Sequence, residues 1–241
     1  MKIFCAKKSG FTLVEMAIVI VIISLITVGI MTGKSLVKQA EIAALMKDVE
    51  KIKTAYQAYK LKFDAQPGDH NNAVYYLGAG TENGDGNRQI DITGTQNYVE
   101  RFLAWEHLTL SKLYPGLYPG TDSVANKTSI GENVPKGSVS QTGFEIYYDR
   151  GTGLDWTEIT SPGNYITFAA ETSDLSDGRL HGVSLSPVDI WGLEKKYDDE
   201  DDSTGLMGKI RGMYLNTSTW STLCYDKTKD SNECFVFFKA E

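Results

Sequence analysis

Residues 11 to 33 read FTLVEMAIVIVIISLITVGIMTG and contain one charged side chain, Glu15. About 20 apolar residues in a helix cross the roughly 30 Å hydrocarbon core of a bilayer, so this stretch predicts a membrane-spanning helix. The leader before it, MKIFCAKKSG, carries three lysines and no acid. Because basic flanking segments stay on the cytoplasmic side, we expect the chain from about Lys34 onward to lie outside the cytoplasm.

Two ordinary interpretations of an N-terminal apolar stretch fit this one less well. A cleaved secretory signal has an apolar core of about 7 to 15 residues and a small-residue cleavage site. The uncharged run from Met16 to Gly33 is longer, and no clean A-x-A site follows it. A simple membrane anchor leaves Glu15 unexplained, because a carboxylate in an apolar helix costs about 2.5 to 3.5 kcal/mol. Glu15 therefore needs a partner.

The residues around Gly10 carry a specific resemblance. Lys7-Lys8-Ser9-Gly10 followed by Phe11-Thr12-Leu13-Val14-Glu15 resembles the class III signal of type IV pilins and of the pseudopilins of type II secretion. The resemblance implies that a prepilin peptidase cuts after Gly10 and methylates the new N-terminus, Phe11. It also implies that Glu15 pairs with the N-terminal amine of a neighbouring subunit in the filament. Since an unpaired charge in low dielectric is unfavourable, such a pair would select one axial register.

This resemblance predicts the function, the partners and the location of the chain. It implies a structural subunit of a type IV pilus-like filament or a type II secretion pseudopilus, and no enzymatic activity. The expected partners are prepilin peptidase, other pilin or pseudopilin subunits, and an inner-membrane assembly platform with its ATPase. The precursor would be a single-pass protein of the bacterial inner membrane with a periplasmic head, and later part of a periplasmic pseudopilus or a surface pilus. The alternative is a minor or tip pilin that acts as an adhesin or substrate-binding protein.

Cleavage after Gly10 also accounts for the odd number of cysteines. The chain has three cysteines, and Cys5 would leave with the leader, residues 1–10. Cys224 and Cys234 remain, and two cysteines in an extracytoplasmic chain most simply form a disulfide.

Beyond the membrane the sequence predicts that the same helix continues. Apolar residues recur at spacings of three and four across residues 34–63, and no proline occurs between Phe11 and Gln66. We therefore expect one helix with a transmembrane or filament-core half, residues 11–33, and an amphipathic half, residues 34–63. Docking on a globular head is the favoured explanation of the stripe, and a coiled coil is the alternative. The stripe consists of Ile42, Leu45, Val49, Ile52, Tyr56, Tyr59 and Phe63.

Residues 64–241 predict an α+β head with an antiparallel β-sheet and short helices. Asp69 can cap a short turn through Leu77, Asn97 with Glu100 can start a helix over residues 98–113, and Ser186-Pro187 can start one that ends near Lys196. Five segments rich in β-branched or aromatic residues predict strands. They are Phe144–Asp149, Tyr165–Ala170, His181–Leu185, Gly212–Asn216 and Cys234–Lys239.

Loops rich in oxygen ligands predict a calcium site in the head, as some pseudopilins have. The loop around Gly84 and Gly86 alternates ligands with glycines, although Thr81 and Ile92 stand where an EF-hand loop has carboxylates. A second candidate is the acidic run after Tyr197, and the alternatives are a glycine-rich turn and a solvated acidic run. The candidate ligands are Asn83, Asp85, Asn87, Asp91, Asp198, Asp199 and Asp202.

Composition argues against nucleic acid and against catalysis. The formal net charge is −7, whereas a protein that coats nucleic acid needs an excess of basic residues. The histidines, His70, His107 and His181, stand in no metal-binding spacing, and neither a nucleophile elbow nor a phosphate loop occurs. We expect His107 to be structural and the four tryptophans to lie mainly in the core.

Overall fold

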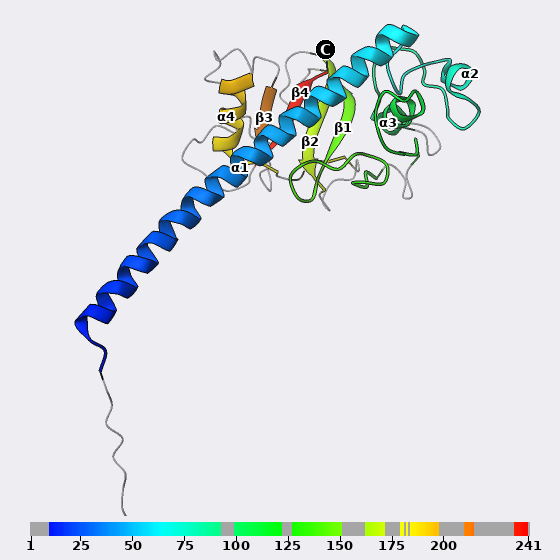
Figure 1. The fold of residues 1–241 in the computed structure, drawn as a ribbon. Helices are drawn as coiled ribbons and strands as arrows, with labels where there is room; N and C mark the ends of the chain where they lie inside the picture. The colour runs from blue at the N-terminus through cyan, green and yellow to red at the C-terminus, as the bar shows by residue number, and fades with distance from the viewer. Residues whose placement is uncertain are drawn as a thin grey trace, which may run out of the picture. The chain divides into compact units, whose positions relative to one another are not determined.

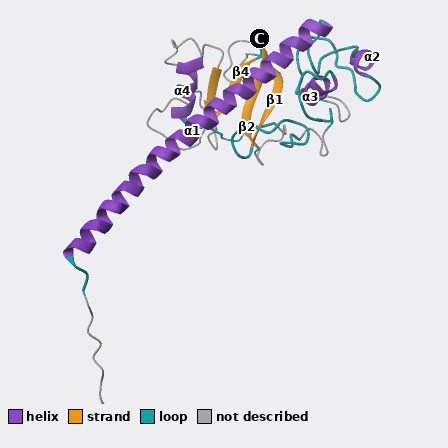
Figure 2. Cartoon of the chain, in the orientation of Figure 1, coloured by secondary structure: helices purple, strands orange, loops and turns teal. Residues whose placement is uncertain are grey.

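The computed structural model of the chain describes residues 10–92, 99–121, 127–150, 162–171, 179–180, 182, 184–197, 210–214 and 234–240. The elements there confirm the predicted α+β class (Figures 1 and 2). The chain divides into two compact units at Ala43 and Ala44, so the first helix contributes to both. In chain order the elements are α1 (Leu13–Phe63), α2 (Ala73–Leu77), α3 (Glu100–Leu110), β1 (Thr142–Asp149), β2 (Gly163–Ala170), α4 (Pro187–Tyr197), β3 (Ile210–Tyr214) and β4 (Cys234–Lys239).

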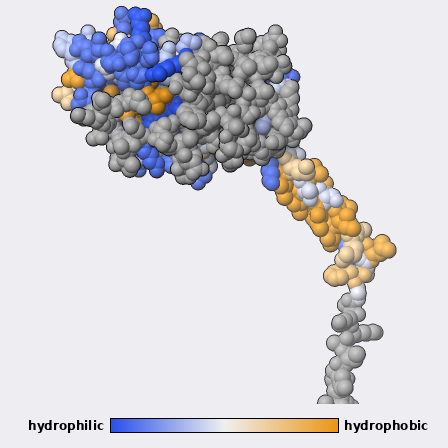
Figure 3. All heavy atoms as spheres, turned by 180° about the vertical axis from the view of Figure 1, so that it is seen from behind, coloured by the Kyte–Doolittle hydropathy of each residue, from blue (hydrophilic) through white to orange (hydrophobic). Residues whose placement is uncertain are grey.

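The first unit contains α1 as far as Ala43, and most of it is the apolar stretch that ends at Gly33. Its side chains are exposed, and Figure 3 shows the apolar surface of this segment in orange. The hydroxyls of Ser24, Thr27 and Thr32 each donate to the carbonyl oxygen four residues earlier, at 2.7 to 3.1 Å, so the helix satisfies them internally. By length and composition α1 can cross a membrane.

Residues 44–63 of α1 belong to the head and bury most of the predicted stripe, whereas Ile42 and Phe63 are half-buried. Leu45, Val49, Ile52, Tyr56 and Tyr59 are all fully buried. Their spacing places them on one face of the helix, which lies across one face of the β-sheet (Figure 1). The Tyr56 hydroxyl also accepts a hydrogen bond from the side-chain amide of Asn164 on β2, at 3.3 Å. Residues 44–63 of the amphipathic half therefore pack in the head, as predicted, whereas residues 34–43 belong to the first unit.

The sheet has four strands in the order β1-β2-β4-β3, and all three pairings are antiparallel. Side chains on both of its faces are buried. α1 lies across one face (Figure 1), and Arg101 of α3 reaches Glu145 on the other. Successive side chains of a strand point to opposite faces, so the register assigns the two sets. Phe144, Ile146, Ile166, Phe168, Val236 and Phe238 form the face toward α1, and Glu145, Tyr147, Tyr165, Thr167 and Phe237 form the other.

A buried carboxylate, Glu145, holds three separate segments against the second face. It accepts hydrogen bonds from the Thr128 hydroxyl and from the backbone N–H of Leu180, which lies 2.9 Å away. The guanidinium of Arg101 on α3 lies 3.7 Å from the same carboxylate, and neither side chain is exposed. A buried charge is tolerated when it is paired and hydrogen-bonded, and Glu145 meets both conditions.

Some predicted element boundaries were wrong. In the predicted strand 181–185, residues 182 and 185 form isolated bridges with Ala170 and Cys234, and His181 and Val183 lie outside the described residues. No strand is assigned to the described part of this segment. The strand predicted at 212–216 begins earlier, at Ile210. The helix predicted over 98–113 spans Glu100–Leu110, and Asn97 lies outside the described residues.

The start of α4 agrees with its sequence signal. The Ser186 hydroxyl lies 2.6 Å from a carboxylate oxygen of Asp189 and 3.3 Å from the Asp189 backbone N–H, and Pro187 is the first helical residue. This is a reciprocal cap.

Candidate functional site

The first candidate site is the N-terminus of α1. Glu15 Oε2 accepts hydrogen bonds from the backbone N–H of Thr12, at 2.7 Å, and from the Thr12 hydroxyl, at 2.8 Å. In return the backbone N–H of Glu15 lies 3.2 Å from Thr12 Oγ1. This reciprocal arrangement is a capping box, in which the first residue and the fourth satisfy free N–H groups at a helix start. The carboxylate of Glu15 therefore has partners within its own chain.

Thr12 is the residue that sequence reasoning missed here. The pattern Thr12-Leu13-Val14-Glu15 fits the S/T-x-x-E signature of a capping box, and this signal was available from the sequence. Glu15 was instead treated as a charge that needed a partner on another subunit. The structure adds an intramolecular partner to that expectation.

The predicted processing site lies just before this cap. Gly10 and Phe11 precede the first helical residue, Leu13, and both are exposed, Phe11 by 80%. The bond between them is therefore outside the hydrogen-bonded part of the helix.

The second candidate site is a group of loops held together by carboxylates at the end of α1. Asp69 is buried and accepts three backbone hydrogen bonds, from Gly86, Asn87 and Arg88, at 2.7 to 2.9 Å. We expected Asp69 to cap a turn through Leu77, but the short helix α2 begins at Ala73, and its N-cap residue, Asn72, makes no side-chain cap bond. Asp69 instead fixes the loop that follows α2.

Glu100 of α3 holds the two ends of the same loop. Its Oε1 accepts the backbone N–H of Asp85 and its Oε2 that of Asp91, each at 2.9 Å. We expected Glu100 to belong to the cap of its own helix, so its role as the partner of a distant loop is a correction. The capping pattern was misleading because the same acceptor serves either a local or a distant N–H group.

Most of the calcium ligands predicted in this loop form hydrogen bonds with one another. Asp85 accepts from the backbone and side-chain amides of Asn87, and the Asn87 side chain lies 3.4 Å from Asp91. Asn83 accepts from the backbone N–H of Val74. The other predicted ligands, Asp198, Asp199 and Asp202, lie outside the described residues.

Three carboxylates of this region form a group that could hold a metal ion. Oxygens of Asp69, Asp85 and Glu100 lie within 4.8 Å of one another. Burial raises the pKa of Asp69 to about 6 and that of Glu100 to about 7, and the negative charges of Asp69 and Asp85 add to the rise at Glu100. Only Asp85 was among the predicted ligands, because Asp69 and Glu100 are distant from it in the sequence.

His107 anchors the same loops from the other side. Its ring is fully buried, and its Nδ1 accepts the backbone N–H of Gly68 at 2.9 Å. Its Nε2 lies 3.0 Å from the carbonyl oxygen of Glu82, so one neutral tautomer satisfies both contacts. Burial lowers the pKa of His107 to about 4. The structural role expected for His107 is thus observed, and it lies in joining residues 68 and 82 to α3.

Gly68 could not be another residue in this arrangement. Its φ is +90°, and a Cβ would lie 2.3 Å from the carbonyl oxygen of Glu100. Close approach of the backbone to α3 brings the Gly68 N–H to His107.

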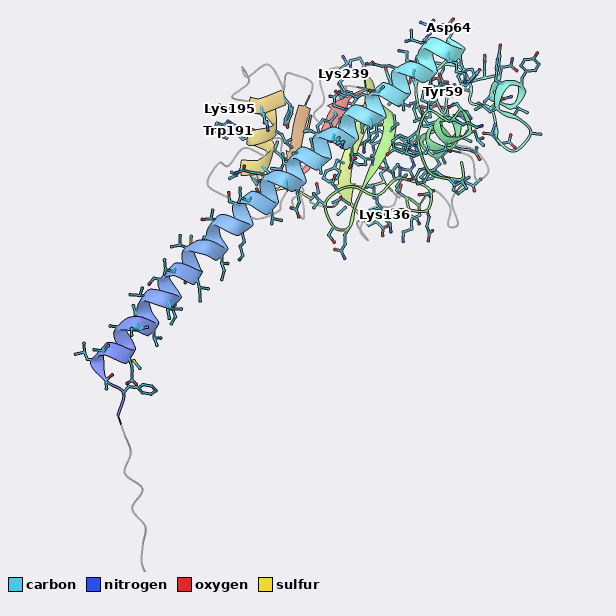
Figure 4. The ribbon with its side chains drawn as sticks, viewed as in Figure 1. Tyr59, Asp64, Lys136, Trp191, Lys195 and Lys239 are labelled. Atoms are coloured by element: carbon cyan, nitrogen blue, oxygen red, sulfur yellow. The ribbon has the colours of Figure 1, made fainter. Side chains whose placement is uncertain are left out.

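An aromatic cluster surrounds these contacts. The ring of Tyr59 stacks on His107 with centroids 6.1 Å apart, and its hydroxyl lies 2.8 Å from His70 Nδ1. Figure 4 labels Tyr59 near the end of α1 that carries Asp64.

The tryptophans divide between core and surface. Trp105 is fully buried, as expected, whereas Trp191 is 37% exposed on the outer side of α4 (Figure 4). Trp156 and Trp220 lie outside the described residues.

The predicted disulfide has one described cysteine. Cys234 is buried at the start of β4 and is disulfide-bonded. Cys224 lies outside the described residues, so its pairing with Cys234 stays a prediction.

Comparison with known families agrees with the N-terminal signal. Residues 5–31 match the model of the prokaryotic N-terminal methylation motif. No curated protein and no solved structure matches the chain. The chain carries a signal of the type IV pilin and pseudopilin type, and at this level it is a membrane-anchored, pilin-like precursor.

We expect the substitution His107→Gln to alter how stability depends on pH. The folded-state pKa of His107, about 4, is below the ordinary value of 6.5, so the native state binds fewer protons than the unfolded state. Its contribution is present above pH 6.5 and is lost as pH falls toward 4, by about 2 kcal/mol between pH 7.5 and 5. A glutamine amide can accept from Gly68 and donate to Glu82 without titrating.

The measurement is urea unfolding of both proteins at pH 7.5 and pH 5. Asp69 and Glu100 have raised pKa values, so their contribution to stability falls as pH rises through 6 to 7, in the direction opposite to that of His107. Both proteins contain these carboxylates, so the difference between the two pH profiles reports on His107. The variant should therefore gain stability on acidification relative to the wild type. Identical pH profiles would contradict the assignment.

Proposed function

We propose that this chain is the precursor of a structural subunit of a type IV pilus-like filament or a type II secretion pseudopilus. The observation that carries the proposal is the methylation motif on a helix whose stretch from Leu13 to Gly33 is largely exposed and contains one carboxylate, Glu15. Families with this motif are structural, and the motif implies processing by prepilin peptidase and assembly with other pilin subunits.

The exposed half of α1 supports assembly through this helix. The apolar side chains from Leu13 to Val37 are largely exposed in the single chain. Such a surface is stable in lipid or against other apolar helices, and it is unfavourable in water. The inner membrane would therefore store the subunit, and neighbouring helices in a filament would replace the lipid. An inner-membrane platform with its ATPase would supply the work of extraction.

Glu15 is the residue that would guide this replacement. In the single chain its carboxylate is held by Thr12. In the filament we propose that it turns to the methylated N-terminal amine of Phe11 on a neighbouring subunit. The carboxylate then has a partner both before and after assembly. Only one axial register of neighbouring subunits would bring the Phe11 amine to it.

The first test of this function is the N-terminus of the mature protein. The chain extracted from membranes should begin at methylated Phe11 when prepilin peptidase is present, and should retain residues 1–10 when it is absent. Intact mass and N-terminal sequencing distinguish the two forms. A chain cut beyond Gly33, or one of full length despite an active peptidase, would contradict the proposal.

The second test separates processing from assembly. The substitution Glu15→Val should leave cleavage after Gly10 intact and sharply reduce the yield of sheared filaments, because the register pair is lost. Thr27→Val is the matched control, since it also replaces a polar side chain by an apolar one in the same helix. The Thr27 hydroxyl bonds only to its own helix in the described contacts, at Ile23 O. Normal filament yield from Glu15→Val would refute the register role.

We propose further that calcium binds the head at Asp69, Asp85 and Glu100. Calcium takes oxygen ligands at about 2.3 to 2.6 Å, so oxygens within 4.8 Å of one another can share one ion. The raised pKa values of Asp69 and Glu100 support this choice, because a divalent cation would remove the cost of burying the like charges.

Calcium should then raise the melting temperature of the protein at pH 7.5, and less so at pH 5, where protons compete. At a concentration 100 times Kd the stabilisation is about 2.7 kcal/mol. Asp85→Asn should remove the shift. Asp91→Asn makes the same change of charge in the same loop outside the carboxylate group and should retain it. An equal shift in both variants would exclude this site.

A further inference from the structure

We propose that the head binds a neutral oligosaccharide in a cavity at the C-terminal end of α1. The cavity has a volume of about 490 Å³, which is within the range of small-ligand sites. Figure 4 labels one of its lining residues, Asp64, at this end of the helix. The polar side chains that line it are those of Lys60, Asp64, Gln66, Asp69, Asn71 and Arg88.

The lining points to an uncharged ligand rich in hydroxyl groups. Two cations and two carboxylates border the cavity, so an anion would meet Asp64 and Asp69, and a cation would meet Lys60 and Arg88. Four of the six polar side chains are planar carboxylates or amides, and a fifth is a guanidinium. These groups offer several donors or acceptors in a fixed plane. A sugar ring presents adjacent hydroxyls that both donate and accept, and it matches such a lining without a net charge.

The walls of the cavity are held in place before any ligand binds. Three backbone hydrogen bonds to Asp69 fix residues 86–88, and Arg88 is held at a φ of +71°. Asn164 on β2 donates to the Arg88 carbonyl oxygen at 3.3 Å. The Tyr56 hydroxyl donates to Gln66 at 2.8 Å. Few side chains would therefore need to become ordered on binding, which lowers its entropic cost.

An exposed aromatic pair lies on α2, a few residues along the chain from Asn71 of the cavity wall. Tyr75 is 78% exposed and Tyr76 is 56% exposed, and their rings meet edge to face with centroids 5.0 Å apart. Tyr76 packs on Phe63 and on His70, at 5.8 and 5.5 Å, and these are the chain neighbours of Asp64 and Asn71 in the cavity wall. The apolar C–H face of a sugar ring stacks on such rings. The pair would extend the site beyond the cavity to a second sugar unit.

This inference rests on the proposed function, because a filament is where the subunit would meet a glycan. It deepens that function by naming a ligand class for the head. Binding itself belongs to the single subunit. A chain that is not cut after Gly10, or that does not polymerise, would still bind sugar. The two proposals can therefore fail separately.

The test uses the full processed chain in a detergent that has no sugar headgroup. The probes are four neutral disaccharides: cellobiose, lactose, maltose and N,N′-diacetylchitobiose. We expect at least one to bind in the millimolar range or tighter, measured by isothermal titration calorimetry and by saturation-transfer NMR. Saturation should reach the sugar C–H protons from tyrosine rings. Failure of all four to bind at about 10 mM would overturn the proposal.

Variants locate the site. Asn71→Ala and Tyr75→Ala should each weaken binding about tenfold, which corresponds to the loss of one good polar or stacking contact. Both side chains are exposed, so the fold should tolerate their loss. Asn72→Ala is the matched control, because Asn72 is the exposed neighbour that does not line the cavity and makes no cap bond. Equal affinity in Asn71→Ala and the wild type would place the sugar elsewhere and refute this site.

Discussion

Glu15 sets the central constraint on this protein, because a carboxylate in an apolar helix must keep a partner wherever the helix lies. Thr12 provides that partner within the chain through a reciprocal cap. The cap also satisfies N–H groups at the start of α1, which an apolar environment would otherwise leave without acceptors. One short motif therefore satisfies both the carboxylate and the free N–H groups of the helix start.

In the loops of the head, too, buried polar side chains have hydrogen-bond partners within the chain. Asp69, Glu100 and His107 act mainly as acceptors of backbone hydrogen bonds, and each joins segments that the sequence separates. These side chains are buried, so an unmade bond would cost the full desolvation of the group. The loops after α1 consequently have a defined shape without regular secondary structure, and the cavity beside Arg88 follows from it.

The long helix, its buried stripe and the main strands could be predicted from the sequence, because hydrophobic periodicity and the absence of proline act locally. The cap at Ser186 was predicted for the same reason. Glu100 shows why the rest was not: its pattern with Asn97 predicted a local cap, while its carboxylate holds Asp85 and Asp91. The carboxylate group could not be assembled from spacing, since Asp69 and Glu100 meet only after α3 docks. Thr12 was predictable and was missed.

The distant hydrogen bonds of the loop after α1 have a consequence for the order of folding. The bond from Gly68 to His107 spans 39 residues, and that from Arg88 to Asp69 spans 19. Closing such loops costs entropy before any contact rewards it. Gly68, Asp85 and Asp91 are held by His107 and Glu100, so residues 64–92 depend on α3 for their shape. This loop therefore becomes ordered no earlier than α3 packs against it.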